Sequence, residues 1–204
     1  MEREIRAFNF EVRAEKNDEH GTILEGRPIV YDSRNDLGWY DEIIEKGALT
    51  DTDLKDVRFL VNHNTDMIPL ARSRNNNANS TMQMEIDDEG MKIRVDLDTE
   101  NNSEAKALYS AVKRGDISGM SFMFTVDGDK WDDYESEHPT RTVTKISKVF
   151  EVSAVTFPAY EQTSISARGL SEALDSAKKS LDSVRAEAEK VERRKQVIRI
   201  LNMK

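Results

Sequence analysis

Residues 115–126 read GDISGMSFMFTV, which places a turn of small residues directly before an aromatic strand. Every second residue from Met120 to Val126 is large and apolar, which is the period of a strand that buries one face. The same period puts Ser121 on the other face, at the start of the strand. Glycine in the preceding turn lets the backbone approach this serine closely. The stretch therefore predicts a buried strand that begins at a serine.

Two further strands are expected after it, over 142–146 and 149–157, and Pro158 ends the second. Glu151 interrupts the otherwise apolar second run. A buried carboxylate is costly unless it is paired or hydrogen-bonded. Glu151 is therefore either a solvent-facing residue at a strand edge or a paired group inside the fold, and the period alone favours neither.

The first hundred residues are also typical of β structure. Alternation predicts hairpins over 8–31 and 82–97, and the apolar run 57–61 predicts a buried strand that ends at His63. A short helical or turn-like piece is expected over 41–46. Residues 101–115 predict a helix with Asn and Ser as N-cap candidates and Gly115 at its end. The stretch 127–139 is expected to be an acidic loop that holds Trp131 and His138.

From Leu170 onward the apolar period becomes helical, with 4-3 spacing typical of a heptad repeat. Lys195 breaks this apolar series. The residues on either side of the apolar series are charged. The series consists of Leu170, Leu174, Ala177, Leu181, Val184, Ala188, Val191 and Ile198.

We therefore expect an α+β fold with a mostly antiparallel, β-barrel-like body, at least one internal helix and a long C-terminal amphipathic, coiled-coil-like helix. Residues 1–160 form the body and 170–204 the heptad helix. Residues 161–169, rich in small polar residues, form a linker or a self-cleavage segment.

Composition removes several classes of function. The 204 residues carry 30 Lys and Arg against 39 Asp and Glu, a net charge of −9, which argues against a protein that neutralises nucleic-acid phosphates. With no cysteine, disulfides, thiolate catalysis and cysteine-based zinc sites are excluded. Three histidines make a histidine-rich metal centre improbable, so no metal or cofactor is expected. No apolar run is long enough for a membrane span, and the first residues do not read as a secretory signal.

Three side chains could together perform acyl transfer. A serine nucleophile needs a base, and the base benefits from a third group that fixes its tautomer. Ser121, His63 and Glu151 supply these types, although each also has a structural interpretation as an ordinary strand residue. Ser118 is a rival nucleophile in the same turn. The spacing of these residues does not show that they meet.

Five segments in this order resemble the prohead, or capsid-maturation, protease family of tailed bacteriophages, whose fold is similar to that of herpesvirus assembly proteases. The departures from the family pattern are Leu49, Ala71 and Met123, none of which removes a candidate group. The five segments are EGRPIVY (25–31), YDEIIEKGAL (40–49), VNHN (61–64) with PLAR (69–72), GDISGMSFMF (115–124) and EVSAVTFPA (151–159).

The resemblance implies a serine endopeptidase with Ser121 as nucleophile and His63 as general base. Glu151 is preferred as the third member over His138, since herpesvirus relatives use a second histidine there. It also implies action inside the prohead in the host cytoplasm, on the scaffolding segment of the major capsid protein and on the protease itself.

Two other functions stay open: a non-catalytic scaffold or assembly protein of the same fold, and, ranked low, a hydrolase with a carboxylate pair. The C-terminal helix either stabilises the body or a second copy, or docks onto scaffold helices. Neither direct nucleic-acid binding nor membrane binding is expected.

Overall fold

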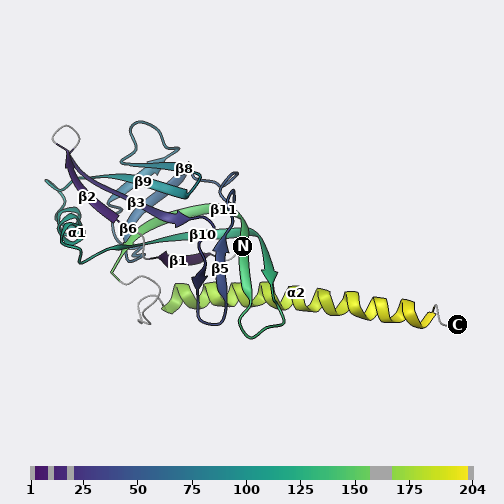
Figure 1. The fold of residues 1–204 in the computed structure, drawn as a ribbon. Helices are drawn as coiled ribbons and strands as arrows, with labels where there is room; N and C mark the ends of the chain where they lie inside the picture. The colour runs from purple at the N-terminus through teal and green to yellow at the C-terminus, as the bar shows by residue number, and fades with distance from the viewer. Residues whose placement is uncertain (1–2, 9–11, 18–20, 157–166, 202–204) are drawn as a thin grey trace.

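The computed structural model describes residues 3–8, 12–17, 21–156 and 167–201, drawn in colour in Figure 1. The fold is mixed α+β, with strands through residue 155 and a long helix at the C-terminal end. The elements are β1 (Glu4–Phe8), β2 (Val12–Asn17), β3 (Gly21–Val30), β4 (Asn35–Asp36), β5 (Asp41–Ile44), β6 (Asp56–Val61), β7 (Ala71–Arg74), β8 (Met82–Asp87), β9 (Gly90–Leu97), α1 (Ser103–Arg114), β10 (Gly119–Asp132), β11 (Thr140–Val155) and α2 (Ala167–Leu201).

The larger of two sheets has seven strands, centred on the long strands β10 and β11. Strand β1 pairs with the free edge of β10, while β11 pairs with β5 near its start and with β6 near its end. Those two pairings of β11 are parallel, and the other pairings between the described strands are antiparallel. The two sheets remain open at their edges in the described residues, so the expected barrel-like closure is not confirmed.

The smaller sheet has the order β2-β3-β9-β8 and contains the hairpin expected over 82–97. It also contains, as β2–β3, the part of the first expected hairpin from Val12 onward, whereas Phe8 belongs to β1 of the larger sheet. At the first residue of β9, Gly90 has φ +140°, and a Cβ there would lie 2.0 Å from the carbonyl oxygen of Ile29. Only glycine fits this approach of β9 to β3. Leu24 and Ile93 of this sheet share one apolar core with Phe122 and Val152 of the larger sheet.

Helix α1 begins and ends where the sequence predicts. The Asn102 side chain accepts hydrogen bonds from the backbone N–H groups of Glu104 and Ala105, at 2.9 and 3.2 Å. Gly115 ends the helix in the left-handed region, with φ 80°. Leu108 and Val112 pack into the core shared by the two sheets.

Two local predictions are wrong. Residues 41–44 form strand β5 instead of a helical piece, because they pair in parallel with residues 140–143 of β11. The expected acidic loop begins later, since β10 continues to Asp132 in register with β11. Trp131 is therefore a buried strand residue. The first difference arises from pairing with a segment far along the chain, which local sequence patterns do not report. The second arises because the β10–β11 hairpin extends into the acidic stretch.

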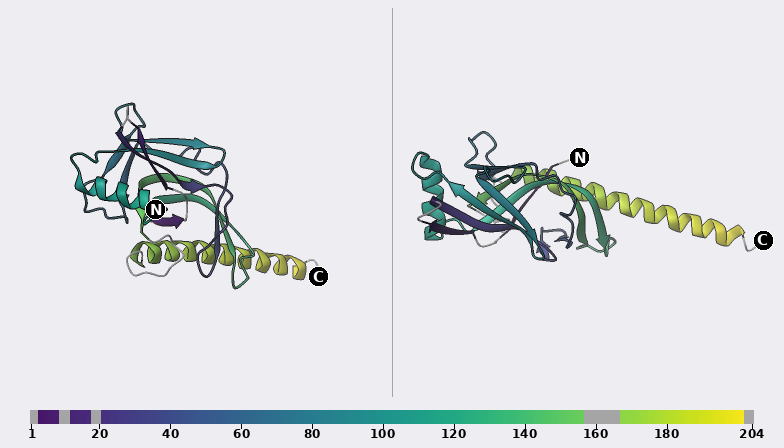
Figure 2. Two further views of the ribbon diagram at one scale, coloured as in Figure 1. Left: turned by 60° about the vertical axis from the view of Figure 1, so that its left-hand side comes forward. Right: turned by 90° about the horizontal axis from the view of Figure 1, so that it is seen from above.

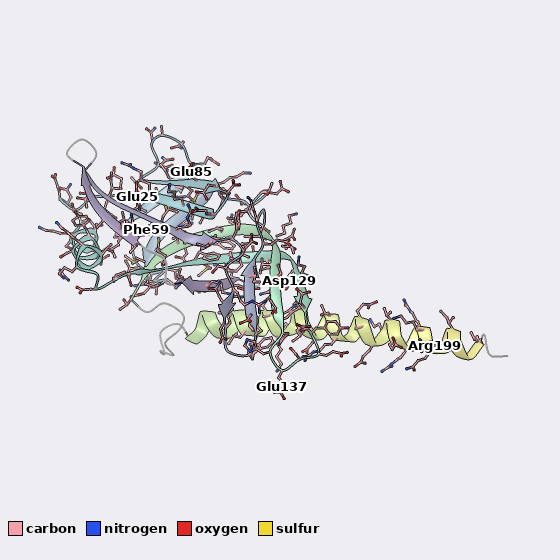
Figure 3. The ribbon with its side chains drawn as sticks, in the orientation of Figure 1. Glu25, Phe59, Glu85, Asp129, Glu137 and Arg199 are labelled. Carbon is pink, nitrogen blue, oxygen red and sulfur yellow. The ribbon has the colours of Figure 1, made fainter. Side chains whose placement is uncertain are left out.

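Helix α2 lies along the body over its first half and projects beyond it over the second (Figures 1 and 2). Ala177 and Leu181 are buried against Tyr40 and Trp131. Figure 3 shows Asp129 beside the packed half and Arg199 on the projecting half. Residues 161–166 of the expected linker lie outside the described residues, and 167–169 already belong to α2. Neither helix of the described ranges is long and apolar enough to cross a membrane.

Candidate active site

Three neighbouring strands bring the candidate residues to one face of the larger sheet. Ser121 on β10 is paired with Ser153 on β11, and Ser153 is paired with Leu60 on β6, three residues before His63. Directly opposed residues in an antiparallel pair point to the same face, with Cβ atoms roughly 5 Å apart. Glu151 precedes Ser153 by two residues and shares that face. The register therefore places Ser121, Ser153 and Glu151 together.

Glu151 holds the His63 ring. Nδ1 of His63 lies 2.5 Å from Oε1 of Glu151, whose side chain is only 3% exposed. A carboxylate accepts hydrogen bonds, so Nδ1 is the protonated ring nitrogen in this arrangement, and in the neutral imidazole Nε2 carries the lone pair. Nε2 is buried and has no hydrogen-bond partner among the described residues. An imidazole held in this tautomer is arranged to accept a proton at Nε2.

Ser153 completes the support of this pair. Its hydroxyl donates to Oε2 of Glu151 at 2.6 Å and accepts from the backbone N–H of His63 at 3.1 Å. One buried hydroxyl thus connects the carboxylate to the main chain that carries the imidazole. Sequence analysis did not single out Ser153, although it stands two residues after Glu151 in the quoted segment EVSAVTFPA.

The backbone at His63 is in an unusual conformation. Asn62 and His63 have φ 51° and 56°, in the left-handed region that few residues other than glycine adopt. The turn is held by the Asn62 N–H, which donates to the carbonyl of Ala154 at 2.9 Å, and by a 2.9 Å bond from the Thr156 N–H to the Asn62 side chain. Such strain persists where surrounding contacts fix it, and it clusters at functional sites.

Ser121 is fully buried, and its hydroxyl donates to the backbone carbonyl of Arg6 on β1 at 2.7 Å. It is therefore not hydrogen-bonded to Nε2 of His63, which lacks a partner in the described structure. The structure thus brings His63 and Glu151 into contact and places Ser121 on the adjacent strand of the same face. No sequence pattern indicated that β1 would pair with β10 beside the serine.

Two rival candidates, Ser118 and His138, were also named from the sequence. Ser118 is exposed in the turn before β10. His138 precedes the opposite end of β11, where its Nε2 lies 3.1 Å from Oδ1 of Asp41. With Asp36, these two residues place one possible metal-ligand atom each within 4.8 Å of the others, a grouping that sequence analysis did not predict. Burial would raise the pKa of Asp41, but hydrogen bonds from His138 and Arg34 outweigh it and lower the pKa.

A buried ionic cluster anchors β1, the strand that pairs with β10 beside Ser121. Arg6 pairs with Glu4 at 2.6 Å and with Glu42, and Arg141 pairs with the same two carboxylates at 2.7 and 3.1 Å. The exposed fraction of each of these four side chains is at most 2%. Two carboxylates against two guanidinium groups balance the charge, which is the condition for burying ions at tolerable cost. The Ser176 hydroxyl of α2 also donates to Glu4 at 3.0 Å.

Electrostatics within the cluster favour the charged forms of Glu4 and Arg141. Burial would raise the pKa of Glu4, but Arg6 and Arg141 outweigh it and lower the pKa below its ordinary value. Burial would lower the pKa of Arg141, but Glu42 and Glu4 raise it instead. Burial also raises the pKa of Tyr40, whose hydroxyl accepts a 3.3 Å hydrogen bond from Arg6. β1, β5, β11 and α2 are therefore joined by charge as well as by apolar packing.

Comparisons with known proteins agree with the class that the site suggests, a serine protease. A family model described as caudovirus prohead serine protease matches residues 8–179. The chain therefore belongs to the caudovirus prohead serine protease family. Among solved structures, it is similar to the capsid assembly protease of bacteriophage T4, with 11% identity, a TM-score of 0.35, and coverage of 74% of this chain and 98% of the T4 chain. No curated protein matches.

Proposed function

We propose that the protein is a serine endopeptidase of capsid maturation, with Ser121 as nucleophile, His63 as general base and Glu151 as the group that orients the base. The observation that carries the proposal is the His63–Glu151 pair, which is 2.5 Å apart and leaves Nε2 without a hydrogen-bond partner among the described residues. The strand register puts Ser121 on the same sheet face as Glu151. Membership of the prohead protease family supports the same activity.

The proposed reaction begins when the Ser121 hydroxyl turns from the Arg6 carbonyl toward Nε2 of His63. Oγ attacks the carbonyl carbon of the scissile peptide bond while its proton passes to Nε2, and Glu151 stabilises the imidazolium that forms. Collapse of the tetrahedral intermediate breaks the C–N bond, and the leaving amine takes the proton from Nε2. Water then repeats the sequence and releases Ser121 with the new carboxyl product.

The proposed substrates are the scaffolding portion of the major capsid protein and the protease itself, cut inside the prohead. A shell that assembles around scaffold must lose it to make room for DNA, and an enclosed protease meets this need. The net charge of −9 suits an enzyme that does not hold incoming DNA.

Helix α2 is proposed to carry the enzyme into the particle. Its heptad seam packs on the body at Ala177 and Leu181 and continues past it through Val191 and Ile198, which are 40% and 57% exposed. Such a seam fits a partner helix, either of scaffold or of a second copy. A coiled coil formed by this segment, and the domain boundaries near 160 and 170, belong to this proposal.

The decisive experiment is co-expression with the capsid protein of the same phage, read by intact-mass spectrometry. Wild type should cleave the capsid protein and itself, Ser121→Ala should cleave neither, and Ser118→Ala should match wild type. Cleavage that survives in Ser121→Ala and disappears in Ser118→Ala would move the nucleophile.

The alternative is a non-catalytic assembly protein of the same fold. It is favoured by the complete burial of Ser121 and by its hydrogen bond to Arg6. In that case folded wild type would leave capsid protein intact in assembled proheads and would not react with a fluorophosphonate, a small probe of activated serines.

A further inference from the structure

We infer that the hollow between helix α1 and the turn that carries His63 is a specificity pocket, which takes a large apolar side chain of the substrate. The inference rests on the proposed peptidase function. The hollow has a volume of about 420 Å³, within the usual range for ligand sites. Its apolar lining consists of Val61, Met67, Ala107, Leu108, Ala111 and Ile117.

Its position ties it to the His63 site. Val61 and Asn62 come directly before His63, Asn64 follows it, and all three line the hollow. Ile117, which also lines it, lies in the turn that leads into β10 and Ser121. A peptide that brings its scissile bond to His63 must therefore pass beside this hollow. In an extended peptide, alternate side chains point to opposite sides, and pockets for those side chains confer specificity.

The far wall is rigid and built from small residues. Ala107 and Ala111 stand one turn apart on α1, on the face next to the hollow, and the helix is capped at both ends by Asn102 and Gly115. Larger residues at these two positions would fill the space. Alanine on this face therefore leaves room for a Leu, Ile, Met or Phe side chain.

A charged residue at the hollow limits which substrate side chains can bind there. Glu104, which is exposed in the first turn of α1, also lines the hollow. A like charge beside it would be repelled, so an acidic side chain is disfavoured here. The occupant is therefore a large neutral apolar side chain at one fixed position relative to the scissile bond.

The test is cleavage-site profiling of the full-length protein on a library of peptides derived from a bacterial proteome. Wild type should select a large apolar residue at one fixed position. Ala107→Phe and Ala111→Phe should each lower kcat/KM for such peptides by at least about tenfold, the scale on which pocket size discriminates substrates. Peptides with Gly or Ala at that position should be cut at nearly the wild-type rate.

Lys113→Phe is the matched control, because Lys113 is exposed on the same helix and does not line the hollow. This variant should keep the wild-type profile. An apolar preference that persists in both filled variants would overturn the inference, as would a wild-type profile without a fixed apolar position. Labelling of Ser121 by a fluorophosphonate separates these results from failure of the proposed function, since labelling should be equal in wild type and all three variants and absent from Ser121→Ala.

Discussion

Nδ1 of His63 and Oε1 of Glu151 lie 2.5 Å apart, although 88 residues separate them in the sequence. The contact exists because β6 pairs in parallel with the end of β11, which places the turn after β6 beside the Glu151 strand. Glu151 is thus a buried carboxylate whose partner, His63, is the proposed general base. The interpretation of Glu151 as a solvent-facing edge residue is wrong, because the residue is 2% exposed.

Replacing Glu151 by Gln should lower kcat/KM by about 10²–10⁴, since the amide no longer stabilises the imidazolium and disturbs the ring tautomer. The side chains have nearly the same size, and a neutral imidazole, unlike the guanidinium groups beside Glu4, leaves no buried charge unpaired, so the melting temperature should change little by comparison. The measurement is the rate of capsid-protein cleavage together with thermal unfolding. Glu85→Gln, at an exposed position on β8, is the control and should leave the rate unchanged. Wild-type cleavage by Glu151→Gln would contradict the role given to the carboxylate.

Replacing Ser153 by Ala should destabilise the fold by about 1–3 kcal/mol, because the His63 N–H and one carboxylate oxygen of Glu151 lose their partner. The rate of cleavage should also fall, since the imidazole is then less firmly oriented. Ser73→Ala is a matched control at a fully buried serine, whose hydroxyl accepts from the Asn76 N–H at 3.2 Å. It should cost comparable stability and leave the rate per folded molecule at the wild-type value.

Local patterns in the sequence predicted the elements that depend on near neighbours. The alternation over 82–97 predicts the hairpin β8–β9, and the capping residues predict α1. Both elements depend on residues that are close together in the sequence. The strand that begins at Ser121 was predicted for the same reason. The sequence could name Ser121, His63 and Glu151 as types suited to acyl transfer, but not the register that places them on one face.

The buried ionic cluster could not be predicted, because no local signal distinguishes Glu4 and Arg6 from an ordinary charged terminus. Their burial depends on the pairing of β1 with β10 and on the arrival of Glu42 and Arg141 from other strands. Trp131 was assigned to a loop for a related reason. The acidic residues around it suggest solvent exposure, whereas Asp129 is held by Arg141 at 2.7 Å and by Ser180 of α2.

Glu4→Gln should destabilise the protein at neutral pH by about 3–5 kcal/mol, because the buried guanidinium groups of Arg6 and Arg141 then share Glu42 as their one fully buried carboxylate. The lowered pKa of Glu4 sets the pH dependence. Its folded pKa is below the ordinary 4.5, so charged Glu4 contributes stability above that value, and the contribution is lost as pH falls through the folded pKa. The gap between wild type and variant should therefore shrink below about pH 4.5.

Urea unfolding at a series of pH values measures this gap. Glu100→Gln, at an exposed position in the loop after β9, is the control and should follow wild type at every pH. A gap that stays constant down to the acid transition would show that Glu4 stabilises the fold through shape and not through its charge.

Shortening α2 at two points should separate its packed half from its projecting half. Deletion of residues 187–204 keeps Ser176, Ala177 and Leu181 in place, so thermal stability and fluorophosphonate labelling should stay near wild type. Deletion from Leu170 onward exposes Trp131, which α2 covers, and removes the Ser176 hydroxyl that donates to Glu4. Each apolar side chain exposed in this way costs about 1.5–3 kcal/mol, so the longer deletion should lower the melting temperature and reduce labelling.

Incorporation into proheads, measured by mass spectrometry of purified particles, then tests what the projecting half does. The 187–204 deletion should be incorporated poorly, because it lacks Val191 and Ile198, the exposed part of the heptad seam, while its protease body is intact. Glu189→Gln in the full-length chain is the control, since it changes an exposed flank and leaves the seam complete. Normal incorporation of the 187–204 deletion would mean that particle entry depends on the protease body and not on the projecting half of α2. The role of α2 would then be limited to the packing of its first half on the body.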